Sequence, residues 1–324
     1  MLFQKKMEDI LLPKLDFNIY TMDYTYQRNK NHVTREFEDK LAERYGAKRL
    51  FLTSSCMEAI TALLEYLLPE GGNILIDRDV YHETRQYFDF VKRYKITEID
   101  FHDINELEMH IASNDLLYLD NPSFFMKFYP VDLITTLAHS FGKKVIVDNT
   151  LLSFYYMNPI LQGADYCVES YTKYIGGHGD VLAGGIVCKD EPKEDLEWFI
   201  GRRGRMVNAL TVYLLERSLE TLEVRMERHT ENGRYVYNKL KEAGIDAWYS
   251  GYTGCIVLPK MDESVCQKFK FFKKISTFGL PFSSVSYVRS PLFYQYGNFI
   301  RLSCGLENKE TLWKDVAQAL DLKE

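Results

Sequence analysis

Apolar residues in the middle of the chain fall into short runs that alternate with stretches of helical periodicity. The short runs predict strands at 49–55, 71–77, 96–101, 115–122, 143–150, 164–170 and 183–190. The periodic stretches predict helices at 56–68, 81–94 and 131–142. Strands that alternate with helices of this length indicate a mainly parallel sheet that is covered on both faces, which is an α/β architecture.

The pattern changes near residue 208. A long helical region, bent along its length, is predicted at 209–244, and Gly244 closes it. Shorter strands at 254–260 and 298–305 and a last helix at 309–322 indicate a smaller α+β domain. We therefore expect an N-terminal arm and helix at 1–45, a large domain at 46–207 and a C-terminal domain at 208–324.

Composition and charge exclude several classes of protein. The chain has 324 residues, is 46% hydrophobic and carries a net charge of −6 with both signs scattered, so we expect no nucleic-acid partner. It contains no run of about 18 apolar residues, and its first residues lack the apolar core of a signal peptide, so we expect no membrane partner. The six cysteines form no CxxC and no zinc spacing. Reduced, buried thiols in a cytoplasmic protein explain them best.

Polar residues end four of the predicted strands. Ser55 precedes a helix whose first N–H groups, near Cys56 and Met57, are placed to cradle a phosphate. Asp148 ends a buried strand, and "DNPS" follows another at 120–123. The last strand ends at Ser170, with Thr172 and Lys173 directly after it. Because ligands gather at the carboxyl ends of parallel strands, these residues form one candidate site.

The chemistry of these residues suits one cofactor. A buried carboxylate such as Asp148 is costly without a cationic partner, and the protonated ring nitrogen of pyridoxal 5'-phosphate is such a partner. Lys173, near a cationic centre, would have a lowered pKa and could move protons between carbons. Tyr81, which follows a predicted strand, is the candidate for stacking on the ring.

The motifs resemble those of the Cys/Met-metabolism family of pyridoxal-phosphate enzymes, which includes cystathionine synthases, cystathionine lyases and methionine γ-lyase. "SYTKYIGGHGDVLAGGIV" is similar to the lysine signature of that family, and "GKKVIVDNT" to its aspartate segment. "DVYHETRQYF", "YTYQRNKNHVTREFE", "LETLEVRMERHTEN" and "IRLSCGLE" resemble further segments. The resemblance covers nearly the whole chain. It implies fold type I, with a large cofactor-binding domain and a smaller C-terminal domain.

The resemblance also implies a role for each matching residue of the cofactor site. Lys173 would form the Schiff base, Asp148 would bind the ring nitrogen and Tyr81 would stack on the ring. The phosphate would be held by Ser55, Cys56, Met57, Ser170 and Thr172.

Further residues are implied to act between subunits or on the substrate. Tyr26 and Arg28 would reach the phosphate from a neighbouring subunit, which implies a homodimer or homotetramer with shared sites. Arg301 would bind the α-carboxylate of an amino-acid substrate, the backbone of Ser284 would also contact that carboxylate, and Asn121 is a further candidate. Tyr81 or Tyr26 would act as acid or base on the leaving group.

The sequence departs from the family pattern around this site. Cys56 replaces a glycine of the phosphate loop, Phe124 replaces an asparagine near the phenolic oxygen of the cofactor, and His82 and Glu83 replace two glycines. A segment that other members carry is missing between "KEAGIDAWY" and "GYTGCIVLPK". These changes leave the cofactor chemistry in place and alter the substrate walls.

The implied activity is elimination or replacement at Cβ or Cγ of an L-amino acid that carries a leaving group. Two alternatives remain: an aminotransferase or other reaction on the same cofactor fold, and a non-catalytic partner subunit. A metal or nucleotide site on "GGHGD" is disfavoured because GxxxxGK[ST] and HExxH are absent. We interpret His178 as a loop histidine, and His82 as a helix-start residue more readily than as a proton relay.

Overall fold

The computed structural model describes residues 32–192, 196–204, 207–289 and 296–322. Its first sheet has seven strands in the order β1-β7-β6-β5-β4-β2-β3. These strands are β1 Arg49–Thr53, β2 Gly72–Asp77, β3 Tyr94–Ile99, β4 Leu116–Asp120, β5 Lys144–Asp148, β6 Tyr166–Ser170 and β7 Gly184–Cys188. Neighbouring strands are parallel except β7, which runs antiparallel to both β1 and β6.

Helices cover both faces of this sheet, as the sequence predicts. Alternate residues of the strands enter two apolar clusters: Ile74, Ile76 and Ile146 pack with helix α3, whereas Leu75 and Val145 pack with residues of α5 and α6. This alternation is that of a sheet buried on both faces. The helices of this part are α2 His32–Tyr45, α3 Cys56–Leu67, α4 His82–Val91, α5 Ile104–Ile111, α6 Val131–Ser140, α7 Ser153–Tyr156 and α8 Leu196–Arg202.

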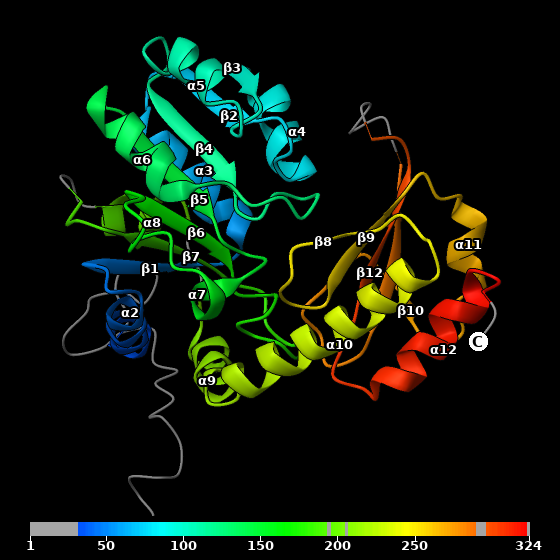
Figure 1. Cartoon of the computed structure of the whole chain (residues 1–324). Helices are drawn as coiled ribbons and strands as arrows, with labels where there is room; N and C mark the ends of the chain where they lie inside the picture. The colour runs from blue at the N-terminus through cyan, green and yellow to red at the C-terminus, as the bar shows by residue number, and fades with distance from the viewer. Residues whose placement is uncertain (1–31, 193–195, 205–206, 290–295, 323–324) are drawn as a thin grey trace, which may run out of the picture.

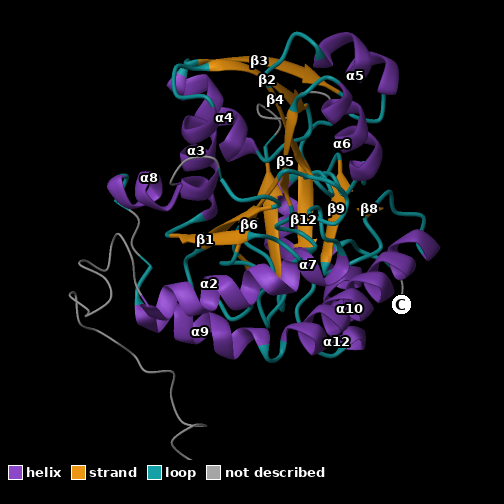
Figure 2. Cartoon of the chain, turned by 90° about the vertical axis from the view of Figure 1, so that its left-hand side faces the viewer, coloured by secondary structure: helices purple, strands orange, loops and turns teal. Residues whose placement is uncertain are grey.

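A second, smaller sheet follows in the sequence, with strand order β10-β11-β12-β9-β8. Its strands are β8 Trp248–Tyr249, β9 Cys255–Pro259, β10 Lys273–Lys274, β11 Ser284–Val288 and β12 Phe299–Ser303. Helices α9 Ala209–Leu219 and α10 Leu222–Glu242 lead into it, followed later by α11 Glu263–Lys268 and α12 Lys309–Ala319. Figure 1 shows α10 running from below the first sheet to the second sheet, and both views show α12 beside it (Figures 1 and 2).

Several features differ from the sequence-based expectation, among them strands β8, β10 and β11, which were not predicted. The bent helical region is two helices that break between Leu219 and Leu222. Helix α5 was not predicted, and α4 ends at Val91 because Lys92 adopts a left-handed conformation (φ 54°) and Tyr94 begins β3. The boundary at 207/208 stays a prediction, since α9 also packs on α2. In the described ranges, no helix is long and apolar enough to cross a membrane.

Candidate active site

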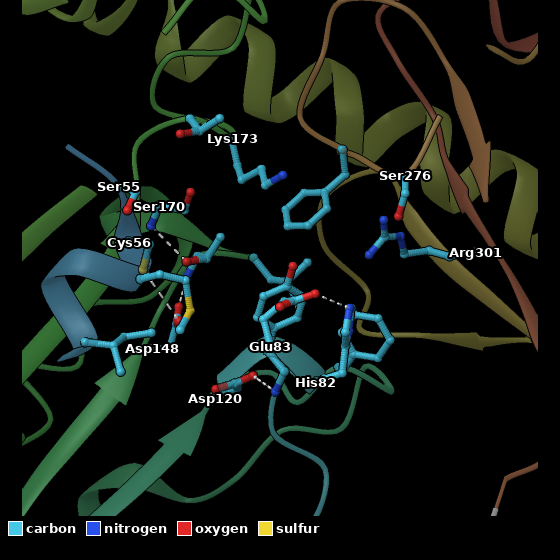
Figure 3. Close-up of a pocket in the computed structure, with 18 of the residues that line it drawn as sticks. Ser55, Cys56, His82, Glu83, Asp120, Asp148, Ser170, Lys173, Ser276 and Arg301 are labelled. Atoms are coloured by element: carbon cyan, nitrogen blue, oxygen red, sulfur yellow. Dashed lines mark hydrogen bonds and ion pairs between the residues drawn. The ribbon is translucent and has the colours of Figure 1, made fainter. Parts of the chain in front are cut away.

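A cavity of about 370 Å³ lies where the carboxyl ends of β4, β5 and β6 meet the second sheet. Figure 3 shows side chains from both sheets around it, among them Ser55, Cys56, Asp148, Ser170, Lys173 and Arg301. These residues are far apart in the sequence. The order of the parallel strands brings the first five together, and β12 brings Arg301 from the opposite side.

The first wall of the cavity is the start of α3. Ser55 is the N-cap, and its hydroxyl accepts a hydrogen bond from the Glu58 N–H at 3.1 Å. Gly184 of β7 lies directly under this turn, because a Cβ placed on it would be 2.5 Å from the Cys56 nitrogen. Cys56 and Met57, the first two residues of the helix, line the cavity. A helix start of this kind favours a phosphate.

Asp148, the last residue of β5, is 8% exposed and lines the cavity. One oxygen accepts the Thr150 N–H at 2.9 Å, and the other lies 3.4 Å from the Tyr118 hydroxyl and 3.8 Å from the Cys56 sulfur. Burial raises the pKa of this carboxyl group, and the hydrogen bonds oppose that effect. Within the described residues Asp148 has no ion pair, so it suits a cationic ligand group such as a protonated pyridine nitrogen.

Lys173 follows β6 and extends into the cavity from the opposite side (Figure 3). Its Nζ donates a hydrogen bond to the Thr277 hydroxyl at 3.0 Å and lies 5.0 Å from the centre of the Phe278 ring. Burial, and then the charge of Arg301, lowers the pKa of Lys173 to about 8. A substantial neutral fraction near physiological pH suits an amine that must react with a carbonyl group.

The glycine pair after Lys173 has a structural reason that the sequence alone does not show. The guanidinium of Arg225, from α10, donates to the backbone oxygens of Tyr174 at 2.7 Å and Ser218 at 2.8 Å. Gly177 adopts a φ of +66°, and a Cβ there would collide with this guanidinium. Arg225 therefore holds the loop that carries Lys173. Sequence reasoning missed it, because a buried arginine in a charged helix gives no periodic signal.

Arg301 of β12 closes the cavity from the second sheet and is 5% exposed. Its guanidinium carbon lies 5.6 Å from the Phe124 ring centre and 5.2 Å from that of Phe278. Across the described ranges it forms no ion pair, and its Nε has no hydrogen-bond partner. A desolvated, planar cation held between two rings suits a carboxylate ligand.

Of the serines that precede Arg301, the structure places the side chain of a different one from Ser284 at the cavity. The Ser284 hydroxyl donates to the Thr277 backbone oxygen at 2.8 Å and does not line the cavity. Ser276, from the same segment, does line it. Ser284 therefore supports the loop, whereas Ser276 and Phe278, which the sequence reasoning missed, face the cavity. No periodic or motif signal separates these positions in the sequence.

Tyr81 lies at the start of α4, and its ring also lines the cavity. Its backbone N–H donates to the buried Asp120 carboxylate at 2.7 Å. Burial, then the charge of Glu83, raises the pKa of its hydroxyl, so the phenol stays protonated. The His82 ring lies 4.5 Å from the Tyr81 ring and also lines the cavity. The prediction that His82 starts a helix is confirmed.

The remaining candidates divide into two groups. Ser170 and Thr172 line the cavity, as expected. Asn121 does not, because its amide side chain exchanges hydrogen bonds with the Tyr129 backbone at 3.0 and 3.1 Å. His178 is a satisfied loop histidine, 2.7 Å from the Gly176 oxygen. Tyr26 and Arg28 lie outside the described residues. The described ranges contain no cluster of metal-ligating side chains.

A sequence profile of the family described as "Cys/Met metabolism PLP-dependent enzyme" matches residues 3–251. The chain belongs to this family. Pyridoxal 5'-phosphate is therefore its cofactor, and the chain is a PLP-dependent enzyme with fold type I architecture. The helix start at the cavity, an Asp148 without an ion pair among the described residues, and the lowered pKa of Lys173 fit that cofactor. The family resemblance inferred from the motifs is confirmed.

The names of the relatives refer to two sulfur amino acids, cystathionine and methionine, and to the ester O-succinylhomoserine. The chain is 28% identical to cystathionine gamma-lyase of Dictyostelium discoideum, over 92% of this chain and 87% of that protein. It is 32% identical to L-methionine gamma-lyase of Fusobacterium nucleatum subsp. polymorphum, over 70% of this chain and 59% of that protein. Among solved structures, metB from Corynebacterium glutamicum superposes with a TM-score of 0.89 at 26% identity, covering 96% and 93% of the two chains.

Proposed function

We propose that this enzyme catalyses elimination or replacement at Cβ or Cγ of an L-amino acid that carries a leaving group, on a sulfur amino acid or an O-acylhomoserine. The observation that supports it is the meeting of Lys173, Asp148 and Arg301 in one cavity with the helix start at Ser55. Elimination consumes one water and releases a 2-oxo acid, ammonia and the protonated leaving group. Replacement joins a nucleophile to the same carbon instead.

Different residues of the cavity would hold different parts of the cofactor. The helix start at Ser55, Cys56 and Met57, with Ser170 and Thr172, would hold the phosphate. Asp148 would keep the ring nitrogen protonated, Tyr81 would cover the ring and Lys173 would anchor the cofactor through its amine. When bound, pyridoxal phosphate supplies an electron sink that stabilises negative charge at the α-carbon of the substrate.

The same residues would move the protons. Arg301 would bind the α-carboxylate in a bidentate manner and so orient the Cα–H bond. Lys173, whose pKa is lowered to about 8, would take the α-proton and, for γ-chemistry, a proton from Cβ. Because burial raises the pKa of Tyr81, its hydroxyl would act as an acid and give its proton to the leaving group. Tyr26 remains a candidate for the same step.

Assembly and location complete the proposal. Tyr26 and Arg28 would reach the phosphate of a neighbouring subunit, so the active form would be a homodimer or homotetramer. A reducing, cytoplasmic location is supported by the six cysteines, which form no disulfide among the described residues.

Purified enzyme supplied with the cofactor should release a 2-oxo acid and ammonia from L-cystathionine, L-methionine or O-succinyl-L-homoserine, or condense the ester with a thiol. Borohydride reduction and peptide mapping should place the phosphopyridoxyl group on Lys173, and Lys173→Ala should abolish turnover. Transfer of the amino group without release of ammonia would indicate an aminotransferase instead. An unmodified Lys173 would contradict its role as the residue that anchors the cofactor.

A further inference from the structure

The first turn of α4 places two titratable side chains on the cavity wall. His82 and Glu83 both line the cavity, next to Tyr81. Figure 3 shows them on the side opposite Lys173. The Glu83 side chain is 52% exposed and its carboxylate lies 3.4 Å from Nε2 of His82, whose side chain is 21% exposed. Glu83 therefore stands at the solvent side of the wall, and His82 packs beneath it.

The two ends of the cavity carry opposite charge. Arg301 is a buried cation from the second sheet, and the Lys173 amine, which donates a hydrogen bond to Thr277, lies toward the same side of the cavity. Glu83 is the solvent-exposed carboxylate at the α4 side, where the buried Asp120 also lines the cavity. His82 does not cancel the charge of Glu83, because burial lowers the pKa of the imidazole and keeps it neutral. An amino acid whose α-carboxylate lies on Arg301 and whose reacting carbons lie near Lys173 must extend the rest of its side chain toward the remaining, open part of the cavity.

A second role of Glu83 does not remove the negative charge that it places at the cavity. As an acidic residue in the first turn of α4, Glu83 interacts favourably with the positive end of the helix dipole. That role fixes no direction for the carboxylate, whereas the cavity lining and the contact with His82 do. The rings of His82 and Phe124 lie 5.8 Å apart, and Phe124 lies against Arg301, so the wall from Glu83 to Arg301 is continuous.

We propose that Glu83 selects substrates by the charge at the far end of their side chain. The enzyme prefers a leaving group that is neutral or bears an ammonium group, and it disfavours a leaving group that ends in a carboxylate. The inference rests on the proposed function for the orientation of the substrate. The favoured class is therefore thioethers and other substrates whose leaving group is neutral or positively charged at its end. An O-succinyl ester, whose leaving group ends in a carboxylate, belongs to the disfavoured class.

Three unreactive amino acids of similar length test this on the holoenzyme: L-norleucine with a neutral end, L-lysine with an ammonium and L-2-aminoadipate with a carboxylate. Calorimetric titration gives their dissociation constants at low ionic strength. In Glu83→Gln, the Kd of aminoadipate relative to norleucine should fall about threefold, and that of lysine should rise by a similar factor, which is the size of one partly exposed charge pair. Glu83→Lys should extend both changes.

Asp89→Asn is the matched control, because Asp89 lies on the same helix, is 67% exposed and does not line the cavity. Unchanged ratios in Glu83→Gln, or equal changes in both variants, would overturn the inference. These probes carry no leaving group, so the result does not depend on the elimination assay. Failure of the proposed function would appear instead as wild-type enzyme that leaves all the sulfur amino acids and esters intact.

Discussion

The lowered pKa of Lys173 has a cost in stability that can be measured. Burial and the charge of Arg301 lower the pKa from its ordinary value of 10.5 to about 8. Each tenfold change in proton affinity corresponds to about 1.4 kcal/mol, so holding the protonated amine in the fold costs about 3 kcal/mol below pH 8. Replacement by methionine keeps the length of the side chain and removes the charge. Cofactor-free Lys173→Met should therefore be more stable than cofactor-free wild type by about 2–3 kcal/mol at pH 7, allowing for partial exposure and the lost Thr277 hydrogen bond.

The sign of the pH dependence makes this prediction specific. Between pH 8 and 10.5 the unfolded chain binds a proton at Lys173 that the folded chain does not, so wild-type stability rises with pH over this window. The advantage of Lys173→Met should fall to less than half by pH 9.5. Urea denaturation at fixed protein concentration measures both values. Lys314→Met, on the exposed face of α12, is the control and should change stability little at either pH. An advantage that is absent at pH 7, or constant between pH 7 and 9.5, would refute the reasoning.

Three further predictions concern the walls of the cavity. Asp148→Asn should retain the cofactor but lower kcat by about 10²–10³, because a neutral amide cannot keep the ring nitrogen protonated; a near-normal rate would show that the ring is held differently. Arg301→Lys should raise the substrate KM about tenfold with a smaller effect on kcat, since the bidentate contact is lost; steady-state kinetics with an unchanged KM would move the carboxylate site. Gly184→Ala should weaken cofactor binding about tenfold in a fluorescence titration, because its Cβ would lie 2.5 Å from the Cys56 nitrogen and displace the helix start, and unchanged binding would mean that this helix start does not hold the phosphate.

The sequence predicted the large sheet well because its strands are buried on both faces. Each parallel strand has to be apolar along its length, so the runs that become β4 and β5 stand out. The ends of those strands could also be read, since a polar residue after an apolar run marks the edge where ligands bind. This is why Asp148 and Lys173 were found together. The sequence could not predict that β7 runs antiparallel to β1 and β6, because the pattern of an apolar run is the same in either direction.

The second sheet and the side of the cavity that it builds were harder to predict. Its strands are short, and two of them have only two residues, too few for a period to show. The segment from Ser276 to Ser284 contains several serines, and only its path in three dimensions decides which of them faces the cavity. The same holds for Arg225, whose role depends on the backbone oxygens that it meets and not on its neighbours in the chain.

The charges of the site explain why it needs both sheets. Asp148 and Asp120 end adjacent parallel strands in direct register, and burial together with their mutual repulsion raises the pKa of Asp120. The first sheet alone would thus offer a cavity dominated by carboxyl groups and by Lys173. Arg301 supplies a second cation from β12, and among the described residues no direct ion pair joins it to either carboxyl group. Each buried charge is left to a ligand: a ring cation for Asp148 and a substrate carboxylate for Arg301. A cofactor and an amino acid bound together provide both, so the electrostatics favour the pair over either alone.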